Sequence, residues 1–203
     1  MRSGSLRKRF LLSISAVAAA LLLFACAAVS PAADIPNPEP DVVKLLPKTD
    51  NVTSWEIYPD TLAYASGDDL TEIYDGGYEL YTKNGVLDAA QQMYRLEDKT
   101  AIVAIHRMSS IQTTNRFFEH WRNSDKKQPT YKHTKALSEG YIYTANGAAN
   151  GLLIRNKYFV TVSVYIDGEK SRAVAEDFLK RISFSIGDLV RSKGKRADDG
   201  QKD

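Results

Sequence analysis

The position of the only cysteine, Cys26, limits how this chain can be stabilised, because it lies near the end of an apolar run at the N-terminus. With no second thiol in the chain, no internal disulfide can form. The part that follows has about 150 residues with helix and strand periodicity, which is enough for one domain with a hydrophobic core. We therefore expect a single domain held together by packing alone.

The apolar run covers residues 10–29 and contains only Ser13 and Ser15 as polar residues. Four basic residues precede it: Arg2, Arg7, Lys8 and Arg9. A basic start, an apolar segment and small residues near its end are typical of an export signal that is not part of the fold.

Three interpretations of this leader stay open. Leu23-Phe24-Ala25-Cys26 resembles the lipobox of bacterial lipoproteins, which predicts a signal peptide over residues 1–25 and a lipid on Cys26, although Phe24 departs from that pattern. Ordinary cleavage after Ala32 is the second interpretation. The third is an uncleaved anchor, since about 20 apolar residues span a bilayer. In each case the basic end stays inside. We expect an exported protein of the bacterial cell envelope that faces the periplasm or the cell exterior.

Cleavage before Cys26 also changes the charge. It removes four basic residues and no acidic ones, so the net charge falls from +2 to −2. A mildly acidic domain lacks the basic balance that nucleic-acid binding requires, and we expect no nucleic-acid partner.

Composition divides the rest of the chain into three parts. Residues 26–40 contain Pro36, Pro38 and Pro40 and form an expected extended linker. Residues 41–187 hold the periodic segments of the domain. Residues 188–203 are charged and poor in apolar residues, which predicts a disordered tail.

Segments with helix and strand periodicity alternate within residues 41–187. Strands are expected at 54–57, 62–65, 86–96, 100–108, within 131–143, and at 151–155 and 158–166. Helices are expected over 66–83, after Ser109 or Ser110, and after Glu169, with Phe178, Leu179 and Ile182 on the inner face of the last one. This order predicts an α+β fold, in which a mainly antiparallel sheet packs against two or three helices.

Two adjacent glycines, Gly76 and Gly77, make the first of these helices unusual. A glycine inside a helix costs on the order of 1 kcal/mol relative to alanine. Gly77 falls in the apolar stripe, so we expect it to let the helix lie close to the sheet. Asp75 and Glu79 fall on the polar side, where carboxylates are usually solvated, but a carboxylate pair could also serve acid–base chemistry.

The candidate binding residues come from this segment and comprise two tyrosines, two carboxylates and a glycine. They are Tyr74, Asp75, Gly76, Glu79 and Tyr81. Tyrosines elsewhere, such as Tyr141 and Tyr143 on one strand face, could line a groove for glycans or peptides, although tyrosine is also a common strand residue.

Other chemistry finds little support in the sequence. His106, His120 and His133 show no spacing typical of metal ligands, and we expect no metal site and a hydrogen-bonded, partly buried His106. No serine lies in a Gly-x-Ser-x-Gly turn. Residues 146–151 contain glycine but lack the lysine and the helix of a phosphate loop, which predicts a mobile loop and no nucleotide cofactor.

The segments Leu45-Leu46-Pro47, Trp55 and Tyr74-Asp75-Gly76-Gly77-Tyr78-Glu79-Leu80-Tyr81 resemble a set of uncharacterised exported bacterial proteins, the domain-of-unknown-function family 6599. Met108-Ser109-Ser110, Phe117-Phe118 and Asn156-Lys157-Tyr158-Phe159-Val160 resemble later parts of its pattern. The resemblance covers nearly the whole domain. It implies export and carries no activity or catalytic residue.

These observations favour a non-enzymatic, lipid-anchored module that binds an envelope protein or a small ligand, or that supports an assembly. A hydrolase or sugar-active enzyme that uses Asp75 and Glu79 is the alternative. A lipid carrier, the third possibility, requires a deep apolar groove.

Overall fold

The computed structural model describes residues 38–49, 52, 54–74, 77–128, 130–134, 139–166 and 170–199, the last four of these by their backbone alone. The leader, Cys26 and the linker up to residue 37 lie outside the described residues. The predictions of a signal peptide, of lipidation and of an extended linker therefore stay predictions.

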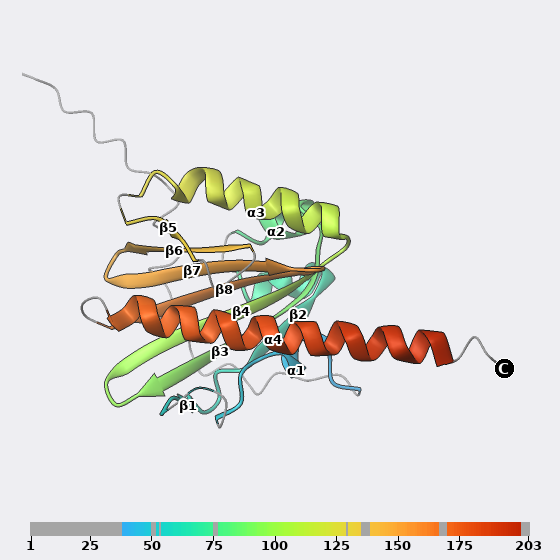
Figure 1. Ribbon diagram of the computed structural model, residues 1–203, viewed down its shortest axis with the longest axis horizontal. Coiled ribbons are helices and arrows are strands. Elements are labelled where there is room, and N and C mark those ends of the chain that lie inside the picture. Colours follow the sequence, from blue (N-terminus) through green and yellow to red (C-terminus); the bar gives the residue numbers. More distant parts are fainter. Residues whose placement is uncertain are drawn as a thin grey trace, which may run out of the picture.

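The elements follow one another as short helices and strands, then long strands and two long helices (Figure 1). They are α1 (Asp41–Lys44), β1 (Glu56–Ile57), β2 (Ala63–Ser66), the 3₁₀ helix η4 (Gly67–Glu72), α2 (Tyr78–Lys83), β3 (Val86–Leu96), β4 (Lys99–Met108), α3 (Ile111–Asp125), β5 (Lys132–His133), β6 (Gly140–Ala145), β7 (Ala148–Arg155), β8 (Tyr158–Tyr165) and α4 (Lys170–Asp199).

The described strands form one eight-stranded antiparallel sheet in the order β1-β3-β4-β8-β7-β6-β5, with β2 also paired to β3. The expected hairpins are confirmed: β3 joins β4 through Glu97, and β7 joins β8 through Asn156, each with a positive φ. The predicted α+β fold with a mainly antiparallel sheet is therefore confirmed.

Helices cover both faces of this sheet. Alternate residues of a strand point to opposite faces, so on β8 Val160 and Val162 contact the layer of α4, whereas Phe159 contacts the layer of α3 and η4. The central strands are buried on both sides: β7 is buried along its whole length except for Arg155. Because both faces of these strands are buried, their sequences are nearly unbroken apolar runs.

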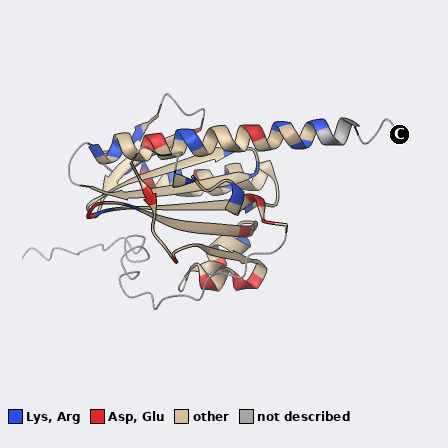
Figure 2. Cartoon of the chain, turned by 90° about the horizontal axis from the view of Figure 1, so that it is seen from below, with Lys and Arg blue, Asp and Glu red and all other residues tan. Residues whose placement is uncertain are grey.

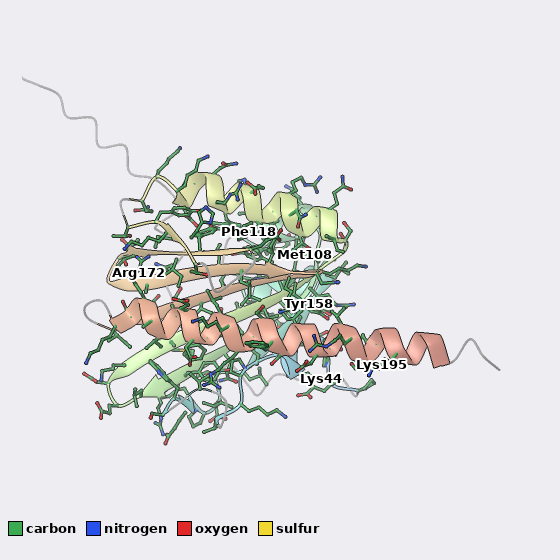
Figure 3. The ribbon with its side chains drawn as sticks, viewed as in Figure 1. Lys44, Met108, Phe118, Tyr158, Arg172 and Lys195 are labelled. Carbon is green, nitrogen blue, oxygen red and sulfur yellow. The ribbon has the colours of Figure 1, made fainter. Side chains whose placement is uncertain are left out.

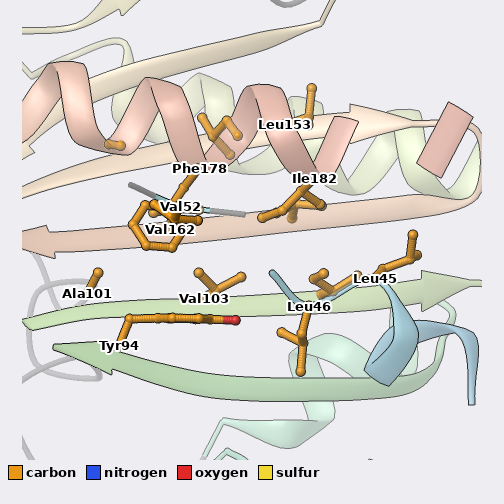
Figure 4. Close-up of a cluster of buried hydrophobic side chains, with 14 of the residues drawn as sticks. Leu45, Leu46, Val52, Tyr94, Ala101, Val103, Leu153, Val162, Phe178 and Ile182 are labelled. Atoms are coloured by element: carbon orange, nitrogen blue, oxygen red, sulfur yellow. The ribbon is translucent and has the colours of Figure 1, made fainter. Parts of the chain in front are cut away.

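The larger core lies between α4 and the sheet (Figure 4). Phe178, Leu179 and Ile182 of α4 are fully buried, as the helical periodicity predicts. The ring of Phe178 packs edge-on against Trp55 and Tyr94, with centroid distances of 5.8 and 5.2 Å. Burying each such side chain contributes about 1.5–3 kcal/mol, which supplies the stabilisation that a disulfide-free domain needs.

Two segments, one predicted as a loop and one as a helix, differ from the predictions. Residues 146–151 are not a mobile loop, because only Asn146 and Gly147 form the turn and β7 begins at Ala148. The single helix expected over residues 66–83 is also wrong. η4 ends at Glu72 and α2 begins at Tyr78, with Gly77 outside the helical region at φ −128°.

The glycine pair accounts for this break, since glycine loses more backbone entropy in a helix than any other residue. The expected close approach to the sheet is absent: a Cβ at Gly77 would meet nothing within 4 Å. Ser66 occupies the N-cap of η4 but makes no side-chain cap bond, whereas Ser110 caps α3 with a complete capping box.

The last helix differs from the prediction at its end, since α4 continues to Asp199 through residues expected to be disordered. Leu189 packs against the core, Arg191 pairs with Asp188, and Lys193 pairs with Asp41 of α1. Lysine and arginine are also good helix formers. The helix therefore extends well past the sheet that its first half covers (Figure 1).

Replacement of Phe178 tests the role of α4. Phe178→Ala should lower the free energy of unfolding by about 3–5 kcal/mol, because it leaves a cavity between the helix and the sheet. Phe184, which is 71% exposed on the same helix, provides the matched control. Phe184→Ala should change the free energy of unfolding by no more than about 0.5 kcal/mol. Urea unfolding measures both, and equal effects would contradict the packing described.

Candidate functional site

The described members of the predicted site lie in two different environments. Tyr74 and Tyr81 come together, with their rings stacked at a centroid distance of 3.8 Å and an angle of 7°. Asp75 and Gly76 lie outside the described residues. Glu79 is exposed on α2 and pairs with Lys83 one turn later. Glu79 is exposed whereas Tyr81 of the same helix packs on Tyr74, so this carboxylate lies apart from the two rings.

His106 completes the tyrosine stack from the sheet. The ring of His106 lies 5.7 Å from that of Tyr74 and 5.4 Å from that of Tyr81. Its Nδ1 lies 2.9 Å from the carbonyl oxygen of Phe159, which can only accept, so Nδ1 donates. Nε2 of the neutral ring is then free to accept a hydrogen bond from the Tyr74 hydroxyl. The predicted hydrogen bonding of His106 is confirmed, and its burial is complete.

Burial keeps this cluster uncharged. It lowers the pKa of His106 to about 4 and raises the pKa of Tyr81 to about 12. It also raises the pKa of Tyr74 well above its usual value. A general acid or base works best with a pKa near the operating pH. The His106 cluster instead attaches η4 and α2 to the sheet.

Glu79 does not have the environment of a catalytic acid. The hydrogen bond from Lys83 lowers the pKa of Glu79, whereas a carboxyl group that gives up a proton near neutral pH needs a raised pKa. The carboxylate pair with Asp75 stays a prediction, because Asp75 lies outside the described residues.

A hollow of about 300 Å³ lies beside α3. We call it the α3 hollow. It lies between α3 and the edge of the sheet formed by β5, β6 and β7. Its lining residues are Asn115, Phe118, Glu119, Arg122, His133, Thr134, Glu139, Gly140 and Ile154. The volume falls at the lower end of the range for small-molecule sites.

A buried network fixes the wall of the α3 hollow. The Tyr141 hydroxyl donates to Oδ2 of Asp125 over 2.7 Å and so attaches the end of α3 to β6. Phe118 packs on the Tyr141 ring at 5.4 Å. Burial raises the pKa of Asp125. Tyr141 is fully buried, so it belongs to the core and does not line a tyrosine groove of the kind considered from the sequence.

The lining of the α3 hollow is polar and of mixed charge. Arg122 pairs with Glu119 at 2.7 Å, and His133 and Glu139 stand on the side of the sheet. The buried Oγ1 of Thr134 has no hydrogen-bond partner among the described residues. Buried polar atoms nearly always have a partner, so this hydroxyl is a candidate contact for a bound group.

Among the described residues, no three histidine, cysteine or acidic side chains come close enough to hold a metal ion. None of the described helices is both long and apolar enough to cross a bilayer.

A solved structure of similar fold comes from comparison with known proteins. It is the extracellular domain of PknH from Mycobacterium tuberculosis, which matches with a TM-score of 0.50 and 10% sequence identity. The match covers 70% of this chain and 94% of that domain. No family model and no curated protein matches the sequence. The likeness therefore concerns the fold, and the resemblance to family 6599 stays a prediction.

The buried His106 predicts a pH dependence of stability. In the unfolded chain its pKa takes the usual value of 6.5, whereas in the folded chain it is about 4. Between these pH values the unfolded chain binds more protons, so stability falls as the pH falls from 6.5 to 4, by on the order of 3 kcal/mol. This loss should be absent in His106→Gln and retained in His120→Gln, whose histidine is exposed.

Urea unfolding at a series of pH values measures this difference. If His106→Gln does not fold, NMR titration of the imidazole in the native chain replaces it. A pKa of His106 near 6.5 would contradict the buried neutral ring.

Proposed function

We propose that this chain is an exported envelope protein, attached to a membrane through a lipid on Cys26, and that its domain is a non-enzymatic module that binds a small polar ligand. The basic and apolar leader, with Cys26 at its end, supports export and lipidation. The similarity to an extracellular domain is consistent with that location.

The α3 hollow carries the binding part of this proposal. Its unpartnered Thr134 hydroxyl and the Arg122–Glu119 pair offer donors and acceptors within one concave surface. Both charge signs lie within this hollow. A zwitterionic or polyhydroxylated molecule, such as a short peptide or a sugar, matches that lining better than an apolar lipid, whose carrier would need a deep apolar groove.

The anchor is tested by its cysteine. The native chain should be recovered in the membrane fraction with an acylated N-terminal Cys26, because the acyl chains partition into the bilayer. Cys26→Ser should leave the protein in an unacylated form. Mass spectrometry of the membrane fraction decides, and an unmodified N-terminus at Ala33 would contradict the lipid anchor.

The α3 hollow is tested with two probes, the zwitterion alanyl-alanine and the neutral sugar N,N′-diacetylchitobiose. At least one should shift the amide NMR signals of Asn115, Arg122, Thr134 and Gly140. Arg122→Ala should weaken this binding at least about tenfold, the equivalent of one lost charged hydrogen bond. Arg116→Ala, an exposed arginine of α3 outside the hollow, is the matched control. Shifts confined to another surface, or none with either probe, would contradict the proposal.

A further inference from the structure

The outward side of α4 carries the most exposed large apolar side chain among the described residues, Phe184, at 71%. The helix cannot turn this ring inward, since Ile182 and Ile186 on either side of it are fully buried. Arg155 also fixes the helix by donating to the carbonyl oxygen and the hydroxyl of Ser183 over 2.9 and 3.0 Å. Gly187 makes room for that guanidinium, as a Cβ there would lie 2.6 Å from it.

Basic side chains accompany Phe184 on the same side of the helix. At 100° per residue, positions within about 60° of Phe184 form one outward stripe. Its basic members are Lys170, Lys180, Arg181, Arg191 and Lys195, and its acidic members are Asp177 and Asp188, with Asp198 and Asp199 at the end of the helix. Figure 2 shows basic residues recurring along α4, with fewer acidic residues between them. We call this stripe the α4 face, and its residue Lys195 is labelled in Figure 3.

Only part of the layer on the other side of the sheet is acidic. Asp68, Asp69 and Glu72 of η4 and Glu79 of α2 are all exposed, whereas α3 of the same layer carries exposed basic residues. The short acidic helices lie across the molecule from α4 (Figure 2). A negatively charged surface repels η4 and α2 and attracts the basic residues of α4.

The first described residues lie beside α4. The described chain begins at Pro38, and Asp41 three residues later pairs with Lys193 of α4. Lys44 of α1 lies close to the second half of α4 in Figure 3. The chain from Cys26 to Asp41 spans at most about 50 Å when extended. A lipid on Cys26 therefore keeps the second half of α4 within that distance of the bilayer.

We propose that the α4 face docks on the surface of an anionic lipid bilayer, with the basic side chains on the lipid headgroups and Phe184 at the boundary with the acyl chains. The tether distance in this argument rests on the proposed lipid anchor, whereas the charge and the exposed ring do not. Each basic residue near an anionic surface strengthens binding by about 1 kcal/mol, or about fivefold. Helices that bind the membrane surface commonly combine basic residues with an aromatic ring that inserts at the boundary of the headgroups.

Vesicle co-sedimentation tests this docking with the mature chain carrying Cys26→Ser, so that no acyl group contributes. Vesicles of phosphatidylglycerol and phosphatidylcholine should bind the protein, whereas vesicles of phosphatidylcholine alone should not. Binding should weaken when the salt concentration rises from about 0.05 to about 0.5 M. Arg191→Ala with Lys195→Ala should weaken it at least tenfold, and Phe184→Ser severalfold, without loss of helical circular dichroism.

The matched control is Lys127→Ala with Lys132→Ala, which removes the same charge from exposed positions on the layer of α3. It should weaken binding less than twofold. Equal binding to both kinds of vesicle, or equal loss in the two double variants, would overturn the proposal. So would a dimer in analytical ultracentrifugation that Phe184→Ser dissociates, because a second copy would then cover the α4 face. A failed test here leaves the lipid anchor intact, since acylation is measured separately.

Discussion

The packing of α4 against the sheet is the interaction on which the rest of the structure depends. Phe178 contacts both Trp55 and Tyr94, and the Tyr94 hydroxyl donates to the carbonyl oxygen of Pro47 over 2.8 Å. One helix thus holds the N-terminal segment and β3 in a single core. A chain without internal disulfides has no covalent substitute for these contacts, so the loss of this core removes the stability of the whole domain.

Periodicity predicted most of the fold, because the long hairpins and the inner face of α4 follow simple apolar patterns. It was wrong where glycines or charged residues determine the ends of helices. The helix predicted over 66–83 breaks beside Gly77, and α4 continues beyond Leu189 through residues predicted to be disordered. The α3 hollow was missed because Arg122, Thr134 and Gly140 come from elements that only the sheet pairing brings together. The place of His106 was not predicted for a related reason. Tyr74 and Tyr81 pack on its buried ring, and this contact with the face of the sheet is not visible in sequence spacing.

The two proposals assign different purposes to the two sides of the domain. The α3 hollow lies on the layer away from α4, and the acidic η4 and α2 share that layer. If the α4 face lies on the bilayer, the layer of α3 is turned toward the surrounding aqueous compartment. A ligand then reaches the α3 hollow from solution while the tether and the basic helix fix the orientation of the domain. The uninterrupted α4 has two roles in this account. Its first half closes the core, and its second half extends the proposed docking surface.

A fluorescent label on the lipid-anchored protein tests this orientation most directly. Acylation of Cys26 leaves no other thiol, so a cysteine introduced as Asp188→Cys on the α4 face, or as Asp69→Cys on η4, is labelled alone. In anionic membranes that contain nitroxide lipids, the label at position 188 should be quenched and the label at position 69 should not. Equal quenching at both positions, or stronger quenching at position 69, would contradict the account.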